Sequence, residues 1–128
     1  MFTHLHLHTQ YSLLEGAIRV KQLAKALKER GFSACAITDH GNLFGAVEFY
    51  RALEKENLKP LIGMGAFVSE VPLAEHPDPN TNLRYFHTQL LCQNRQGYQN
   101  LTYLALSLIH ISEPTRQEAI SYAVVCVK

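Results

Sequence analysis

Residues 2–9 read FTHLHLHT, and polar and apolar side chains alternate along them. Successive side chains of a β-strand point to opposite faces, so a strand here directs His4, His6 and His8 to one face. Four of the seven histidines fall within the first 40 residues. His6 and His8, two residues apart on one face, can reach one metal ion or two adjacent ions, and imidazole suits divalent zinc and manganese. The alternative is that these histidines line a polar strand surface.

The rest of the chain alternates between helical and strand patterns. Apolar residues at helical spacing predict an amphipathic helix over 19–30, followed by Gly31, a residue suited to the position after a helix. The apolar stripe of that helix consists of Val20, Leu23, Ala24 and Leu27. The short apolar run at 33–38, SACAIT, predicts a strand buried on both faces.

A second set of elements follows the turn at 39–42. Residues 43–56 predict a helix whose apolar side carries Phe44, Val47, Tyr50 and Leu53. The later elements are a strand at 59–68, a proline-containing loop at 69–84, a strand at 85–93, and a helix that Asn94 caps and that runs to about Ala105.

This order of elements predicts the fold class. Alternating strands and helices indicate an α/β fold with parallel strands and helices packed outside them. Right-handed crossovers then wind the strands into a barrel or an open sheet. Four strands cannot close an ordinary parallel barrel, so we expect part of a larger fold.

Composition excludes several classes of protein. The 128 residues carry a formal net charge of +1, so no overall field attracts the chain to nucleic acid or to a membrane. Three scattered cysteines without CxxC spacing argue against a disulfide framework or a zinc ribbon and fit a reducing cytoplasm. The N-terminus does not read as a signal peptide, and no apolar run approaches the roughly 18 residues of a membrane span.

Further polar residues fall where predicted strands end. His8 and His40 follow consecutive strands, so parallel pairing brings them to one rim. Asp39 has two interpretations: it orients an imidazole through a hydrogen bond, or it caps the next helix. Glu15 is either a carboxylate ligand or a solvated loop acid. His87, taken singly, is more typical of a core or surface histidine than of a ligand.

Several motifs together resemble a known family. HLHLHTQYSLLEGA (4–17), TDHG (38–41), FGAVEFY (44–50) and GYQNL (97–101) are similar, in order and spacing, to the N-terminal PHP domain of bacterial DNA polymerase III alpha subunits. HxHT and TDHG belong to the wider PHP superfamily, whereas FGAVEFY and GYQNL are specific to the replicative branch. The resemblance covers about residues 2–105.

The resemblance implies a fold and a metal site. The expected fold is about the first half of a distorted (β/α)7 PHP barrel, with up to three metal ions in a cleft at the strand ends. The ligand positions it implies are His6, His8, Glu15, His40 and His87. His4 precedes the motif and is expected to have a structural or supporting role.

The resemblance also implies a function. The parent protein would be a DNA-directed DNA polymerase of DNA replication, and its PHP domain a metal-dependent 3′–5′ exonuclease or phosphoesterase. The expected cofactors are zinc or manganese at the PHP site and magnesium in a polymerase domain outside this chain. The expected partners are DNA, deoxynucleotides, a proofreading exonuclease and a sliding clamp, in the cytoplasm and without a membrane. Because other ligands lie outside this chain, we expect it to be inactive alone.

Two other functions remain open. HxHT and TDHG equally fit a stand-alone PHP phosphatase of small phosphate esters, although FGAVEFY and GYQNL argue against it. The second is a non-catalytic scaffold that docks a separate proofreading exonuclease. Gly65 favours the scaffold, because the resemblance places a metal-bridging carboxylate at this position and glycine has no ligand atom. A base error that converts Glu to Gly is an alternative origin of Gly65.

The C-terminal segment has a separate interpretation. LSLIHISEPTR (106–116) resembles the translation of a sequencing adapter, and the expected domain division is therefore 1–105 for the PHP part and 106–128 for a non-native tail. A genuine strand and loop is the alternative.

Overall fold

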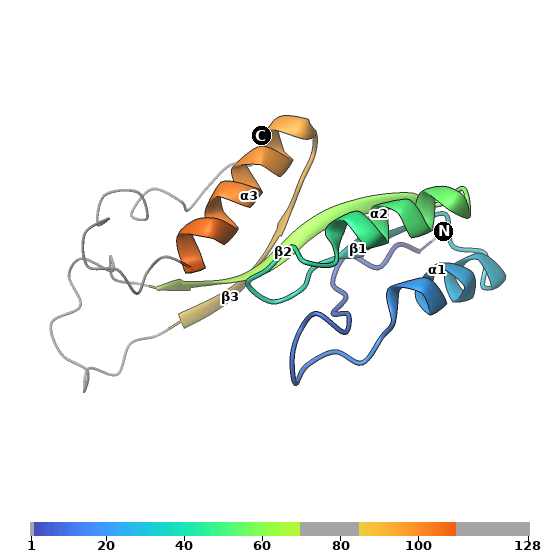
Figure 1. Ribbon diagram of the computed structural model, residues 1–128, viewed down its shortest axis with the longest axis horizontal. Helices are drawn as coiled ribbons and strands as arrows, with labels where there is room; N and C mark the ends of the chain where they lie inside the picture. The colour runs from blue at the N-terminus through green and yellow to red at the C-terminus, as the bar shows by residue number, and fades with distance from the viewer. Residues whose placement is uncertain (1, 70–84, 110–128) are drawn as a thin grey trace, which may run out of the picture.

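The computed structural model describes residues 2–69 and 85–109. Its strands are β1 (Ala34–Ile37), β2 (Lys59–Ser69) and β3 (Tyr85–Leu91). Its helices are α1 (Val20–Glu29), α2 (Ala46–Lys55) and α3 (Arg95–Ile109). The sheet has the order β1-β2-β3, with β1 parallel and β3 antiparallel to β2 (Figure 1). The architecture is α/β, as predicted.

The first hydrophobic core joins α1, β1 and α2. The predicted stripe of α1 is confirmed, because Val20, Leu23, Ala24 and Leu27 are all buried. They pack with Cys35 and Ile37 of β1 and with Phe49 of α2. Gly31 adopts φ +74° directly after α1, a left-handed conformation that glycine adopts without strain. The chain thereby turns from α1 into the buried strand β1.

The predicted apolar face of α2 is confirmed only for Leu53 and is wrong for its other three residues. The residues of α2 that are buried are Ala46, Phe49 and Leu53. Phe44, Val47 and Tyr50 are 69%, 56% and 48% exposed. Apolar residues recur at helical spacing on both sides of this segment, so the period alone does not identify the buried side.

The prediction that all strands are parallel is wrong for β3. Phe67 of β2 lies opposite His87 of β3, and Gly65 lies opposite Gln89, in an antiparallel register. Parallel neighbours need a crossover connection, usually a helix, whereas β2 and β3 follow one another with only residues 70–84 between them. The predicted loop at 69–84 lies almost entirely outside the described residues.

The predicted strand at 2–9 is not regular. The segment runs beside β1, with bonds from Ala36 N to His4 O (2.8 Å) and from Thr38 N to Leu7 O (2.9 Å). Between these two bonds the first segment advances three residues, from His4 to Leu7, whereas the partner advances only two, from Ala36 to Thr38. This mismatch interrupts a regular ladder. The Leu7 amide instead donates to Thr38 Oγ1 at 2.9 Å.

Helices α2 and α3 lie on one face of the sheet. Met64 and Ala66 of β2 are buried with Leu101 and Ala105 of α3 in a second core. Because side chains alternate along a strand, Gly65 and Phe67 point to the other face. The side chains of β2 and β3 on that face meet the segment that carries His6 and His8.

The last described helix, α3, ends within the predicted tail. Asn94 Oδ1 accepts a bond from Gly97 N at 2.9 Å, so the predicted cap of α3 is confirmed. Helix α3 continues past Ala105 to Ile109, while residues 110–128 lie outside the described part.

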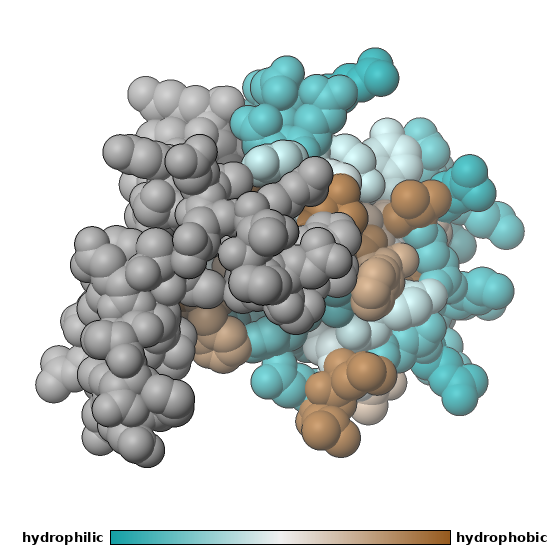
Figure 2. All heavy atoms as spheres, turned by 60° about the vertical axis from the view of Figure 1, so that its left-hand side comes forward, coloured by the Kyte–Doolittle hydropathy of each residue, from teal (hydrophilic) through white to brown (hydrophobic). Residues whose placement is uncertain are grey.

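Among the described helices, none has the length and apolar character of a membrane span. Figure 2 shows apolar side chains interspersed with polar ones on the exposed face.

Candidate metal centre

Four histidines from three separate parts of the chain meet in one cluster, His6, His8, His40 and His87. The ring centroids of His6 and His8 are 4.9 Å apart, and those of His40 and His87 are 5.3 Å apart. His87 also lies 5.8 Å from His6 and 6.5 Å from His8. The structure thus brings together all four histidines among the six predicted site residues. We call these four residues the histidine cluster.

Local backbone geometry positions each member. The alternation along residues 6–8 directs the first two histidines to one side, where their Nε2 atoms are 2.8 Å apart. His40 follows β1, and its backbone forms an isolated parallel bridge to Gly65 of β2. His87 enters from β3 beside Phe67, whose ring lies 4.6 Å from that of His40.

Asp39 anchors the loop beside the cluster. This residue is 1% exposed, and its carboxylate accepts bonds from Thr9 N at 2.6 Å, Thr9 Oγ1 at 2.7 Å and Ser12 Oγ at 2.7 Å. Ser12 Oγ in turn lies 3.0 Å from His8 Nδ1 and accepts a bond from His40 N. Among the hydrogen bonds of the described residues, Asp39 therefore reaches the His8 imidazole through Ser12, and it does not cap α2, which begins after Gly45.

Glu15 approaches the cluster from the same loop. Its Oε2 is 3.2 Å from His40 Nδ1 and 3.8 Å from His8 Nδ1. The first distance is that of an ion pair, and the buried His40 Nδ1 has no hydrogen-bond partner among the described residues. A buried ring nitrogen without a partner costs free energy, and a bound cation would remove that cost.

The protonation of His8 favours metal binding. Burial is the largest cause that lowers the pKa of His8 below its usual 6.5, and the neighbouring His6 lowers it further. Glu15 and Asp39 oppose this shift. A neutral imidazole is the form that binds a metal ion, so the lowered pKa keeps His8 in the ligating form at neutral pH.

The types of donor atom in the cluster suit a divalent cation, but their positions do not form a coordination site. Imidazole nitrogens with a carboxylate oxygen are ligands that zinc and manganese accept. Across residues 2–69 and 85–109, however, no group of three or more His, Cys, Asp or Glu side chains is arranged to hold a metal ion. Side-chain rotation would have to bring a third donor toward the paired Nε2 atoms of His6 and His8.

Gly65 borders the cluster directly. A Cβ atom built on Gly65 would lie 3.0 Å from His87 Nε2 and 3.5 Å from Gln89 Nε2. The position therefore faces the imidazoles, and a side chain there would enter the cluster.

His4 does not belong to the cluster. Its ring contacts those of Phe2 and Phe32, with centroids 4.8 Å and 5.2 Å away. These contacts agree with the structural role expected for His4, and they mean that the three alternating histidines do not share one environment.

Three residues near the cluster were not identified from the sequence. Ser12 links the Asp39 carboxylate to His8, Phe67 packs on His40, and Gln89 Nε2 lies 3.1 Å from His6 Nε2. Gln89 stands two residues after His87, so strand alternation alone places both on one face. Its meeting with His6 depends on tertiary structure.

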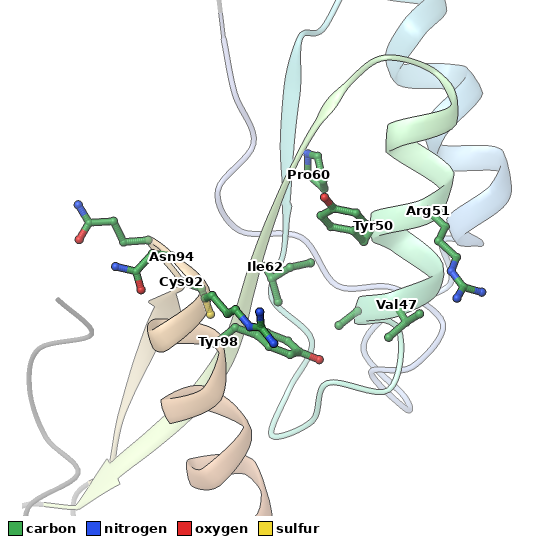
Figure 3. Close-up of a pocket in the computed structure, with 11 residues that line it drawn as sticks. Val47, Tyr50, Arg51, Pro60, Ile62, Cys92, Asn94 and Tyr98 are labelled. Atoms are coloured by element: carbon green, nitrogen blue, oxygen red, sulfur yellow. The ribbon is translucent and has the colours of Figure 1, made fainter.

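A separate groove lies away from the histidine cluster. A cavity of about 570 Å³ between α2 and α3 is lined by Val47, Tyr50, Arg51 and Tyr98, among others (Figure 3). None of the clustered histidines lines it. It is bounded by the helix-covered face of β2, through Pro60 and Ile62, whereas the histidines lie on the other face.

Comparison with known proteins identifies the family of the chain. The PHP domain family model matches residues 4–123. A DNA polymerase III subunit alpha of Helicobacter pylori is 47% identical over 108 residues, which cover 81% of this chain and 8% of that protein. The corresponding subunit of Campylobacter jejuni is 48% identical over 104 residues, and that of Thermus aquaticus 47% over 107 residues.

A solved structure shares the fold. A Bifidobacterium adolescentis protein, described as a candidate metal-dependent phosphoesterase, superposes with a TM-score of 0.56 at 20% identity. The match covers 82% of this chain and 32% of that one.

The chain, which carries its histidine cluster on an α/β sheet, therefore belongs to the PHP family. Within it, the chain is similar to DNA polymerase III alpha subunits, of which it spans only 8 to 9% of the length in the matches above. The family model extends past Ala105, while the matched relatives cover 81% of the chain, so the division at 105 stays a prediction.

Proposed function

We propose that this chain is part of a divalent-metal-dependent phosphoesterase domain whose site is the histidine cluster together with Glu15. The observation that carries the proposal is the convergence of imidazoles from residues 6–8, the end of β1 and β3, with centroid separations of 4.9 to 6.5 Å. Histidines so far apart in sequence have no common packing role that requires their polar nitrogens to meet.

The residues have distinct roles in this proposal. Nε2 of His6 and His8 and Nδ1 of His40 would hold the cation, with His87 and the Glu15 carboxylate as further ligands. When bound, a divalent cation acidifies a water molecule and stabilises negative charge on phosphate oxygens. Asp39 orients His8 through Ser12 and keeps the loop that carries Glu15 closed onto β1.

The relatives suggest the substrate and the parent protein. We infer that the domain acts on phosphodiesters of DNA, as a 3′–5′ exonuclease within a DNA polymerase III alpha subunit of the cytoplasm. Zinc or manganese would occupy this site, and magnesium a polymerase domain outside this chain. DNA, deoxynucleotides, a proofreading exonuclease and a sliding clamp would be the partners. Helices on one face of the sheet and histidines on the other fit the wall of a partial (β/α)7 barrel.

Gly65 favours a second candidate, a non-catalytic scaffold. Its position facing His87 lacks any ligand atom, although a Cβ there would reach the cluster. In this candidate the domain binds a separate exonuclease and hydrolyses nothing itself.

The test uses the complete reading frame that contains this segment. Its product is incubated with a 3′-labelled single-stranded oligonucleotide in Mn²⁺ or Zn²⁺, beside a His8→Asn variant and a His4→Asn control. The proposal expects stepwise 3′ degradation that needs metal, that His8→Asn abolishes, and that His4→Asn retains. Primer extension without any metal-dependent 3′ degradation would instead support the scaffold, and absence of both would contradict the assignment to a replicative polymerase.

A further inference from the structure

Gln89 lies inside the histidine cluster and is incompletely satisfied. Its Nε2 is 3.1 Å from His6 Nε2 and 3.5 Å from His87 Nε2. Its Oε1 is buried and has no hydrogen-bond partner within the part of the chain that the structure describes. A buried amide oxygen without a donor is destabilising, so a polar side chain at this position calls for a role.

The residue opposite Gln89 leaves room for its carboxamide. Gly65 pairs with Gln89 across β2 and β3, and an added Cβ at Gly65 would lie 3.5 Å from Gln89 Nε2. Gly65 does not have the positive φ that would require glycine. The backbone conformation therefore permits a side chain, but its Cβ would lie 3.0 Å from His87 Nε2, so glycine provides space beside both His87 and the carboxamide.

The contacts around Gln89 do not satisfy its carboxamide in this orientation. An amide nitrogen only donates, so Gln89 Nε2 uses the lone pair of His6 Nε2 at 3.1 Å, while the amide oxygen has no donor among the described residues.

In this orientation of the carboxamide, Gln89 Oε1 stays unpaired among the described residues. A half-turn of the last side-chain torsion exchanges Oε1 and Nε2 of Gln89 without a change in shape. The oxygen then faces Nε2 of His6 and of His87. It can accept a hydrogen bond from a protonated Nε2, and where both nitrogens are unprotonated the three atoms together can hold a cation.

We propose that the Gln89 carboxamide oxygen is a ligand of the divalent cation, beside Nε2 of His6 and His87. This inference rests on the proposed function of the cluster and adds a neutral oxygen donor to it. In this proposal, Gln89 of β3 provides the side-chain oxygen that Gly65, its partner on β2, does not have.

The test is Co²⁺ titration of the 128-residue chain, followed by visible absorption, which reports the affinity and the coordination geometry of the bound ion. Gln89→Met keeps the length of the side chain and removes the oxygen. Gln89→Glu keeps an oxygen and removes both amide protons. Gln96→Met is the matched control on α3, where the side chain donates a hydrogen bond to Asn100 away from the cluster.

The proposal expects Gln89→Met to weaken Co²⁺ binding by about tenfold or more and to change the spectrum. Gln89→Glu should bind at least as tightly as the unmodified chain, and Gln96→Met should match it. Adding Gly65→Glu to Gln89→Met should restore affinity, since both positions face His87 Nε2. Circular dichroism of each variant verifies that the fold is retained.

Two results would overturn the inference in different ways. Equal affinity and spectrum in Gln89→Met, or equal losses in Gln89→Met and Gln89→Glu, would exclude an oxygen ligand while leaving the metal site intact. No Co²⁺ binding by the unmodified chain would overturn the proposed metal site itself.

Discussion

Replacing Asp39 by Asn tests whether the buried carboxylate holds the loop at 9–15 onto β1. The carboxylate accepts three bonds of 2.6 to 2.7 Å, two from Thr9 and one from Ser12. Asparagine has nearly the same shape, so the change leaves packing intact while it removes the charge and replaces one acceptor oxygen by a donor NH2 group.

The magnitude follows from the three bonds. A hydrogen bond to a charged group contributes about 1.5 to 3 kcal/mol and a neutral bond about 0.5 to 1.5 kcal/mol, so each bond loses about 1 kcal/mol. Asp39→Asn should therefore lower the free energy of unfolding by about 3 kcal/mol. With a urea dependence of about 2 kcal/mol per molar, the midpoint falls by about 1.5 M.

The assay is urea unfolding followed by circular dichroism at neutral pH. Glu54→Gln, an equivalent change at an exposed position of α2, is the control and should shift the midpoint little. A shift for Asp39→Asn no larger than that of Glu54→Gln would refute the argument that this carboxylate anchors the loop.

Three further outcomes are expected. Phe49→Ala should cost about 3 to 5 kcal/mol because Phe49 is fully buried, whereas Val47→Ala, at a 56% exposed position, should cost far less in the same urea experiment; similar costs would contradict the observed face of α2. Asn94→Ala should cost about 1 kcal/mol through loss of the α3 cap, and an unchanged midpoint would count against that cap. Burial raises the pKa of the Cys35 thiol to about 11, so iodoacetamide at pH 8 should modify Cys35 only after unfolding, as peptide mass mapping would show; rapid modification of the folded chain would disprove its burial.

Sequence patterns were sufficient where one physical constraint dominates. The α1 stripe is predictable because the opposite side of that helix is rich in lysine, so only one face can be buried. The strand β1 is predictable because a short run that is apolar throughout has no polar face. In α2, apolar residues lie on both sides, and tertiary packing decides between Phe49 and Val47.

The candidate site was only partly predictable for a related reason. Strand alternation and the positions after predicted strands identify His6, His8 and His40, since those rules depend on local geometry. The roles of Gln89 and Ser12 depend on the antiparallel register of β3 and on the loop that Asp39 holds. The sequence did contain a signal for the antiparallel pairing of β3. No helix pattern separates the strands at 59–68 and 85–93, and neighbouring strands without a helical crossover usually pair antiparallel.

Metal content after equilibrium dialysis tests the central claim most directly. The chain is dialysed against Zn²⁺ or Mn²⁺, and bound metal is counted by mass spectrometry for the unmodified protein, a His6→Asn and His8→Asn double variant, and a His4→Asn control. A metal-binding histidine cluster predicts at least one ion per unmodified chain, retention in the control and loss in the double variant. Equal metal content in all three proteins, or none in the unmodified chain, would contradict it.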